Sequence, residues 1–127
     1  MHENEISAEI LDAAIKVHSV LGPGLLESVY MKALAYELRK RGLKVELEVP
    51  IYLNYEGVDL GKAFVADAIV EDKVIVEGKA IEDVPRVLKK KLLTYIRLAN
   101  KRLGVLINFG AELIKQGYTR VVDGLEE

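Results

Sequence analysis

The chain has 127 residues, and its 18 Lys and Arg against 20 Asp and Glu give a formal net charge of −2. This balance excludes a general attraction to nucleic acid, so any phosphate binding requires a local basic patch. With no cysteine and only two histidines, disulfides and thiolate sites are excluded, and any metal must be held by oxygen. We expect one cytoplasmic domain over 1–127, because no signal pattern is visible and no apolar run approaches the roughly 20 residues of a membrane span.

Two helices are predicted in the first third of the chain. The first covers about residues 5–20, and its apolar residues recur at helical spacing: Ile6, Ile10, Ala14, Val17 and Leu21. The segment Gly22-Pro23-Gly24 ends it. A second helix covers about residues 25–41 and is ended by Gly42. Its apolar stripe consists of Leu26, Tyr30, Ala33 or Leu34, and Leu38.

Three consecutive strands are predicted next. Extended segments rich in Val and Ile cover residues 45–55, 58–70 and about 73–81. Glu56-Gly57 and Glu71-Asp72 lie between them and are typical of tight turns. We therefore expect a meander of three neighbouring strands.

The last part of the chain predicts a third helix and two more strands. Pro85 suits the first turn of a helix that runs to about Lys101, with the following apolar stripe: Val84, Leu88, Leu92, Tyr95 and Ala99. The apolar run 103–109 predicts a buried strand, and 118–122 an edge strand. The order α-α-β-β-β-α-β-β indicates an α/β or α+β fold with a mixed sheet.

Two charges interrupt the third predicted strand, Val74-Ile75-Val76-Glu77-Gly78-Lys79-Ala80-Ile81. Because side chains alternate along a strand, Glu77 and Lys79 share one face with Ile75. One interpretation is a surface ion pair on a half-exposed strand, which stabilises a protein little. The other is an acid and a base held side by side for chemistry. Glu-x-Lys alone favours the first interpretation.

Asp67 changes this balance, because it is also a lone charge in an apolar extended segment. If the turn lies at Glu71-Asp72, Asp67 and Glu77 are about equally far from it and lie nearly opposite each other on one face. Two such carboxylates repel by up to about 4 kcal/mol at about 4 Å in an effective dielectric near 20. A divalent cation between them removes the conflict, and Mg²⁺ is commonly held by one or two carboxylates plus waters and phosphate oxygens.

An Asp on one strand followed by Glu-x-Lys on the next resembles the PD-(D/E)XK nuclease superfamily. Further motifs resemble the bacterial and archaeal GxxExxY proteins of that superfamily: Gly24-Leu25-Leu26-Glu27-Ser28-Val29-Tyr30, Val17-His18, Leu21-Gly22-Pro23-Gly24 and Leu106-Ile107-Asn108-Phe109-Gly110. The resemblance covers Ile10 to about Val122. It implies a restriction-endonuclease-like fold, in which helices flank a mixed sheet, and a metal-dependent nuclease site.

The resemblance also implies a role for each site residue. Asp67, Glu77 and the backbone carbonyl of Gly78 would bind the metal, and Lys79 would orient or deprotonate the attacking water. Glu27 would bind the metal directly or through water, with Tyr30 as an auxiliary residue one turn further on. From the helix pattern alone, Glu27 is better explained as an acid that stabilises the start of a helix.

The third predicted helix departs from the family pattern. Related exonucleases carry Gln-x-x-x-Tyr facing the site, whereas this chain has Lys91-Leu92-Leu93-Thr94-Tyr95. Lys91 either replaces the glutamine as a phosphate or carboxylate partner, or competes with the metal and weakens the site; Tyr95 keeps its auxiliary place. Gly78 is a second departure, because an apolar residue such as Leu is more usual there and glycine packs poorly inside a strand.

A basic stripe follows the other side of the same helix. It consists of Arg86, Lys90, Arg97 and Lys101. It could contact a nucleic-acid backbone, and a solvated helix face explains it equally well.

The sequence therefore predicts an enzyme that uses Mg²⁺ or Mn²⁺ to hydrolyse phosphodiester bonds, with DNA favoured over RNA as the partner. The alternative is a nuclease-derived module that no longer cuts and binds nucleic acid or protein instead, with homodimerisation left open. Lys91 and the negative net charge favour this alternative, and the fold alone does not separate the two.

Overall fold

The fold is built around a five-stranded mixed sheet. The computed structural model describes residues 1–126, and Glu127 lies outside the described residues. The strands are β1 (Val45–Tyr55), β2 (Val58–Val70), β3 (Val74–Lys79), β4 (Leu103–Asn108) and β5 (Tyr118–Val122). They lie in the order β1-β2-β3-β4-β5. β3 pairs with β4 in parallel, and the other neighbouring pairs are antiparallel.

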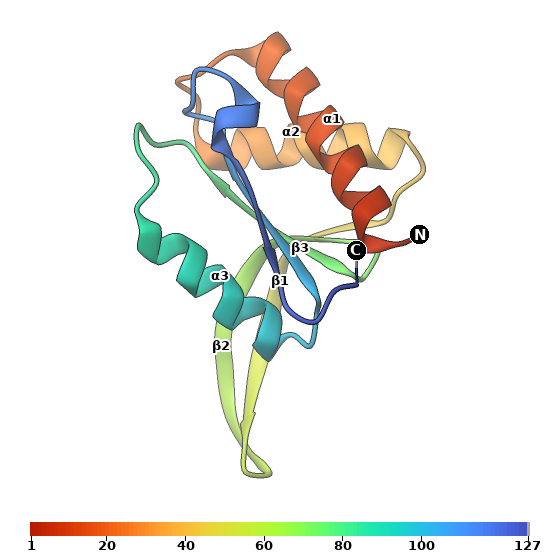
Figure 1. Ribbon diagram of the computed structural model, residues 1–127, viewed down its shortest axis with the longest axis vertical. Helices are drawn as coiled ribbons and strands as arrows, with labels where there is room; N and C mark the ends of the chain where they lie inside the picture. Colours follow the sequence, from red (N-terminus) through yellow and green to blue (C-terminus); the bar gives the residue numbers. More distant parts are fainter. Residues whose placement is uncertain (127) are drawn as a thin grey trace.

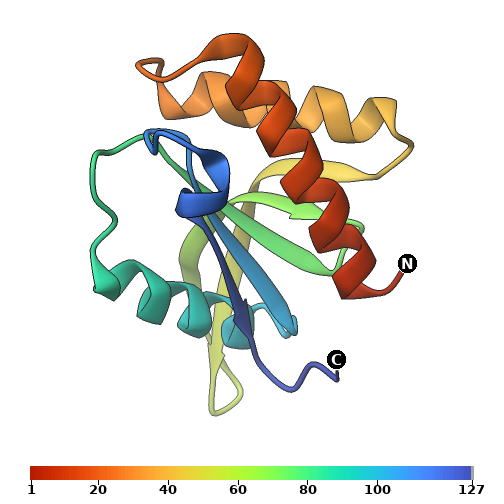
Figure 2. The same ribbon diagram turned by 45° about the horizontal axis from the view of Figure 1, so that its top comes forward.

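Helices cover both faces of this sheet. α1 (Glu3–Leu21) and α2 (Glu27–Lys40) pack on one face, and α3 (Arg86–Leu98) packs on the other. Figure 2 shows α1 and α2 above the sheet and α3 below it. The expected mixed sheet flanked by helices and the order α-α-β-β-β-α-β-β are confirmed, and α3 supplies the crossover that the parallel pair requires.

Two tight turns fix the register of the meander. Glu56 and Gly57 both have positive φ, at 52° and 82°, and so do Glu71 and Asp72, at 53° and 56°. This is the pattern of type I′ hairpin turns, whose twist matches that of the flanking strands. The first turn ends a β1–β2 hairpin that extends well beyond the helices (Figure 1). The second sets the β2–β3 register on which the candidate site depends.

The sheet separates two apolar clusters. The larger cluster packs α1 and α2 against Val74, Val76, Val105 and Ile107. The smaller cluster packs Leu92 and Ile96 of α3 against Ile75 and Leu106. Alternation along β3 therefore sends odd-numbered side chains toward α3 and even-numbered ones toward α2, as predicted from the strand pattern.

Three details differ from the sequence predictions. Leu21 and Leu26 do not belong to the buried stripes, because they are 38% and 74% exposed and lie at the last helical position of α1 and at the N-cap of α2. α3 ends at Leu98 instead of near Lys101, since Asn100 takes a left-handed φ of 57° and the Lys101 N–H bonds back to the Ile96 carbonyl.

The third difference is a short 3₁₀ helix, η1 (Ile114–Gly117), which lies between β4 and β5 and which the sequence pattern did not indicate. In residues 1–126, every helix is too short or too polar to traverse a lipid bilayer.

Candidate functional site

The two strand carboxylates face each other at the end of the β2–β3 ladder. Ala68 pairs with Val76, so the next positions outward are Asp67 and Glu77. Asp67 accepts a hydrogen bond from the Gly78 backbone N–H at 2.9 Å. The register expected from the turn at Glu71-Asp72 is confirmed. The side chain of Asp67 therefore lies across the strand pair, beside Glu77.

The carboxyl group of Glu77 is buried beside a second acid, which disfavours its charged form. Glu77 is only 9% exposed, and burial together with the neighbouring Asp67 raises its pKa to about 9, although Lys79 opposes this shift. Its Oε1 atom is buried without a hydrogen-bond partner, as is Nε2 of His18, and these are the two such side-chain atoms in residues 1–126. A buried, unpaired carboxylate oxygen is costly unless a proton or a cation satisfies it.

Lys79 shares a cavity with both carboxylates. The cavity has a volume of about 230 Å³, and it lies between the sheet and α3. Its polar lining comes from Asp67, Glu77, Lys79, Lys91 and Tyr95. The expected grouping of an acid pair with one strand lysine is thus present on the α3 face of the sheet.

The two α3 residues contribute to this cavity in different ways. Tyr95 is held in place because its ring stacks on Phe64 of β2, with centroids 4.0 Å apart and planes 8° from parallel. Lys91 is an exposed residue that lines the cavity, so it adds positive charge to the surroundings of the acids. Lys91 therefore occupies the place that the family pattern gives to glutamine.

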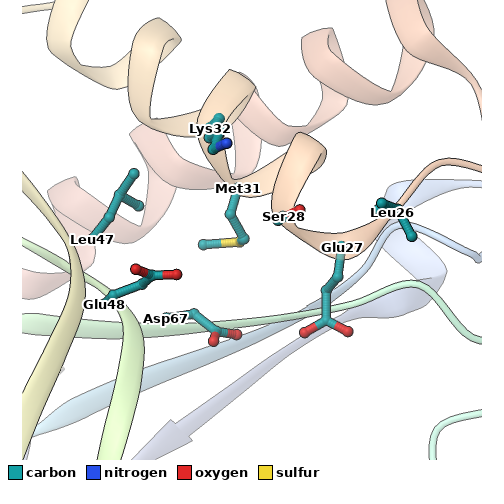
Figure 3. Close-up of a pocket in the computed structure, with 8 residues that line it drawn as sticks. All are labelled: Leu26, Glu27, Ser28, Met31, Lys32, Leu47, Glu48 and Asp67. Atoms are coloured by element: carbon teal, nitrogen blue, oxygen red, sulfur yellow. The ribbon is translucent and has the colours of Figure 1, made fainter.

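Glu27 approaches the sheet from the face that α2 covers, opposite the face that α3 covers. Figure 3 shows Glu27 extending from the first turn of α2 toward the sheet, on the same side of α2 as Asp67. Both residues line a second cavity, of about 420 Å³. Burial raises the pKa of Glu27, the Lys79 ammonium lowers it, and the Asp67 carboxylate raises it. Asp67 lines both cavities, so it links Glu27 to the acid pair.

Tyr30 is placed differently from Glu27, although the two are one turn apart. Tyr30 is fully buried and its ring stacks on Phe109, with centroids 4.7 Å apart. Its hydroxyl donates to the Gly22 carbonyl at 2.5 Å and accepts from the Leu25 N–H at 3.1 Å. Tyr30 thus fixes the loop that leads into α2 and lines neither cavity at the acid residues.

The GxxExxY spacing has a simple geometric explanation. Gly24 has a φ of 103°, a conformation that other residues rarely adopt. Tyr30 binds the loop on either side of this glycine. The first turn of α2, which carries Glu27, is therefore held at a defined position.

Gly78 is explained by its neighbour on α2. A side chain here would start from a Cβ only 2.5 Å from Sδ of Met31 and 3.1 Å from its Cγ. The apolar volume that the family pattern places on β3 is supplied by Met31 instead. This departure therefore leaves the packing behind Glu77 intact.

Asn108 is a site-supporting residue that the sequence analysis did not single out. It is 3% exposed, and its amide group forms a reciprocal pair of hydrogen bonds with the backbone of Ile81, at 3.1 and 2.8 Å. Its Oδ1 also accepts from the Gly110 N–H at 3.0 Å, and the Phe109 N–H donates to the Lys79 carbonyl at 2.7 Å. The segment 108–110 therefore fixes the end of β3 that carries Lys79. Asn108 belongs to the motif Leu106-Ile107-Asn108-Phe109-Gly110, to which the sequence analysis assigned no role of its own.

Glu48 is a further acid beside the site that the sequence pattern did not reveal. Leu47 pairs with Ala68 and Val49 with Ala66, so Glu48 faces Asp67 across the β1–β2 ladder. Its φ of 51° is unusual for a strand residue. It lines the same cavity as Glu27 and Asp67 (Figure 3).

The predicted basic stripe divides into two halves. Arg97 pairs with Asp123 at 3.6 Å, and Lys101 binds both the side chain and the carbonyl of Asp72, at 3.2 and 2.8 Å. These two cations are engaged within the protein. Arg86 and Lys90 are exposed and line a shallow cavity between α3 and β5.

The donor set fits a hard divalent cation with a partly open coordination shell. The structure, over residues 1–126, contains no group of three or more His, Asp or Glu side chains arranged to hold a metal by themselves. Two facing carboxylates with one unpaired buried oxygen are available instead. Oxygen ligands suit Mg²⁺ and Mn²⁺, and Mg²⁺ keeps several waters or takes phosphate oxygens.

A mixed sheet flanked by helices, with an acid pair and a lysine on adjacent central strands, defines the restriction-endonuclease-like class of folds. A family model described as the PD-(D/E)XK nuclease superfamily matches residues 4–121. The chain belongs to this superfamily, whose nucleases generally use divalent metals. Among curated proteins and among solved structures, none matches it.

Proposed function

We propose that this chain is a divalent-metal-dependent nuclease of the GxxExxY kind that hydrolyses phosphodiester bonds, in DNA rather than RNA. The observation that carries the proposal is the buried Oε1 of Glu77, which has no partner and lies beside a second carboxylate, that of Asp67. Membership of the nuclease superfamily supports the same conclusion.

In this proposal, Asp67, Glu77 and the Gly78 carbonyl would hold Mg²⁺ or Mn²⁺, and Glu27, which is not placed to join both acids as a direct ligand, would contribute through water. When bound, the metal lowers the pKa of its water and polarises the phosphate. Charge balance supports the assignment, because the cation removes the repulsion that raises the pKa of Glu77.

Lys79 acts on the attacking water and on the developing charge. It lines the cavity with both acids, so its ammonium group is within the space that a scissile phosphate would enter. A cation held there orients the water and stabilises the negative charge that develops on phosphorus-bound oxygens. Tyr95 limits the cavity from α3, where its stacking on Phe64 keeps it fixed.

The test is a cleavage assay on single- and double-stranded DNA and RNA, with Mn²⁺ or with EDTA. The proposal predicts metal-dependent cleavage that Glu77→Ala abolishes. Glu46→Ala is the matched control, because Glu46 is an exposed acid on β1 and does not line the cavities at the site. Cleavage that persists in Glu77→Ala or in EDTA contradicts the proposal.

A second candidate function is a nuclease-derived module that binds without cutting. The observation that favours it is the Lys91 side chain, which adds a positive charge to the cavity of the acid pair. Salt-sensitive retention of nucleic acid, with no cleavage under any metal condition, would support this candidate.

A further inference from the structure

The N-terminal half of α3 carries a group of unpaired cations. Arg86, Lys89 and Lys90 are exposed, and within residues 1–126 no hydrogen bond or ion pair engages their side chains. Together they form what we call the α3 basic surface. Arg97 and Lys101, at the other end of the predicted stripe, are neutralised by Asp123 and Asp72.

The α3 basic surface is hollowed. Arg86, Lys89 and Lys90 line a cavity of about 330 Å³ with Leu93 and Val121. It lies between α3 and β5, where the lining combines three cations with two apolar side chains. A flat solvated helix face would not place three cations around one depression.

The position of these cations runs against the usual preference of a helix. The first turn of α3 contains no acid, whereas α1 and α2 each begin with acidic residues. Positive side chains near a helix N-terminus add to the positive end of the helix dipole. This applies to Arg86 at the first helical position, while Lys89 and Lys90 lie further along the helix, and an anionic partner would offset the unfavourable position of Arg86.

The α3 basic surface and the candidate site lie on adjacent faces of the same helix. Lys91 follows Lys90 directly and lines the cavity that contains Asp67, Glu77 and Lys79. α3 therefore presents cations both into the site and along its outer side. A polyanion that enters the site is within reach of both.

We propose that the α3 basic surface binds the phosphate backbone of the nucleic acid whose scissile bond lies at the acid pair. This inference rests on the proposed function and adds the path of the substrate over the protein. The charge complementarity commits it to the N-terminal half of α3, and it excludes Arg97 and Lys101 from backbone binding.

The test is fluorescence anisotropy of a labelled DNA duplex of random sequence, in EDTA, over a range of salt concentrations. In the triple variant Arg86→Gln, Lys89→Gln, Lys90→Gln we expect weaker binding. The plot of log binding constant against log salt concentration has a negative slope. Its magnitude should decrease by about 2 to 3, since each phosphate contact contributes about 0.9. All three side chains are exposed, so the variant keeps its fold, which circular dichroism checks.

The matched control is the triple variant Lys40→Gln, Lys44→Gln, Lys115→Gln, which removes the same charge from exposed positions elsewhere. Its salt slope should equal that of the unmodified protein, and so should that of Arg97→Gln. An equal loss in both triple variants, or no loss in the first, overturns the inference.

The outcomes separate this inference from the proposed function, because binding in EDTA needs neither the metal nor cleavage. Binding that depends on the α3 basic surface, without any cleavage when Mn²⁺ is added, contradicts only the proposed function. Cleavage with binding independent of this surface contradicts only the inference.

Discussion

Asp67 accepts a hydrogen bond from the backbone N–H of Gly78, at 2.9 Å across the β2–β3 pair. This bond holds the Asp67 carboxylate next to Glu77, the residue that precedes Gly78 in the chain. The two acids are therefore fixed by backbone geometry and not by flexible side chains. Burial of Glu77 and the neighbouring Asp67 carboxylate both raise the pKa of Glu77 in the folded protein, so we expect the stability of the protein to depend on pH.

The first prediction concerns Glu77 and pH in the absence of metal. Its folded-state pKa is raised from 4.5 to about 9, so the folded state retains a proton that the unfolded chain releases. The stabilising contribution is complete below about pH 4.5 and is lost as pH rises toward about 9. Urea unfolding in EDTA should show the free energy of unfolding falling over this range, and Glu77→Gln should make it flatter. A fall of equal size in Glu77→Gln contradicts the prediction.

The second prediction concerns Asn108. Asn108→Ala removes the hydrogen bonds to Ile81 and Gly110, so the backbone groups at the end of β3 lose their partners. We expect a loss of about 1 to 3 kcal/mol in the free energy of unfolding, together with lower metal-dependent cleavage. Asn54→Ala, at an exposed position of the β1–β2 hairpin, should change stability by less than about 0.5 kcal/mol. If urea unfolding shows an equal change in the free energy of unfolding for the two variants, this account of Asn108 is wrong.

The third prediction ranks two glycines. In Gly110→Ala the new Cβ would overlap backbone atoms of Ile81, including its nitrogen at 2.7 Å, and these cannot move without breaking the contact with Asn108. In Gly78→Ala the nearest atoms belong to the flexible side chain of Met31. We expect Gly110→Ala to cost about 3 kcal/mol or more and Gly78→Ala about 1 kcal/mol. Thermal unfolding checks the order, and the reverse order would contradict it.

The fourth prediction concerns Lys91. Lys91 lines the cavity of the acid pair, so we expect its positive charge to disfavour a cation bound there. Lys91→Gln should raise the affinity for Mn²⁺ several-fold, while Lys89→Gln, on the outer side of α3, should leave it nearly unchanged. Calorimetric titration measures both affinities. An affinity that falls in Lys91→Gln would show that this lysine supports the site.

Most of the fold could be predicted from the sequence because its elements follow strong local rules. Helical spacing located all three α-helices, and the predicted turn placed Asp67 nearly opposite Glu77. The observed loop has three residues, Glu71-Asp72-Lys73, and this sets the two acids directly opposite each other. The boundaries that were wrong depend on single residues. Asn100 ends α3 early through a left-handed conformation that sequence spacing does not reveal.

The remaining parts of the site depend on contacts between distant segments. The sequence pattern assigned no role to Glu48, and its position opposite Asp67 in the folded sheet brings it beside the site. The sequence placed Lys101 in a stripe that could bind nucleic acid. Its ion pair with Asp72 forms because two segments 29 residues apart meet in the fold. Tyr30 lies on the same helix as Glu27, yet its hydroxyl donates a hydrogen bond to Gly22, in the loop between α1 and α2.

The central claim is that Asp67 and Glu77 hold a divalent cation, and calorimetric titration with Mn²⁺ tests it most directly. The account predicts saturable binding by the unmodified protein, loss of that binding in Asp67→Asn and in Glu77→Gln, and unchanged binding in Glu46→Gln. Binding that is equally tight in the Asp67 and Glu77 variants, or no binding by the unmodified protein, would contradict it.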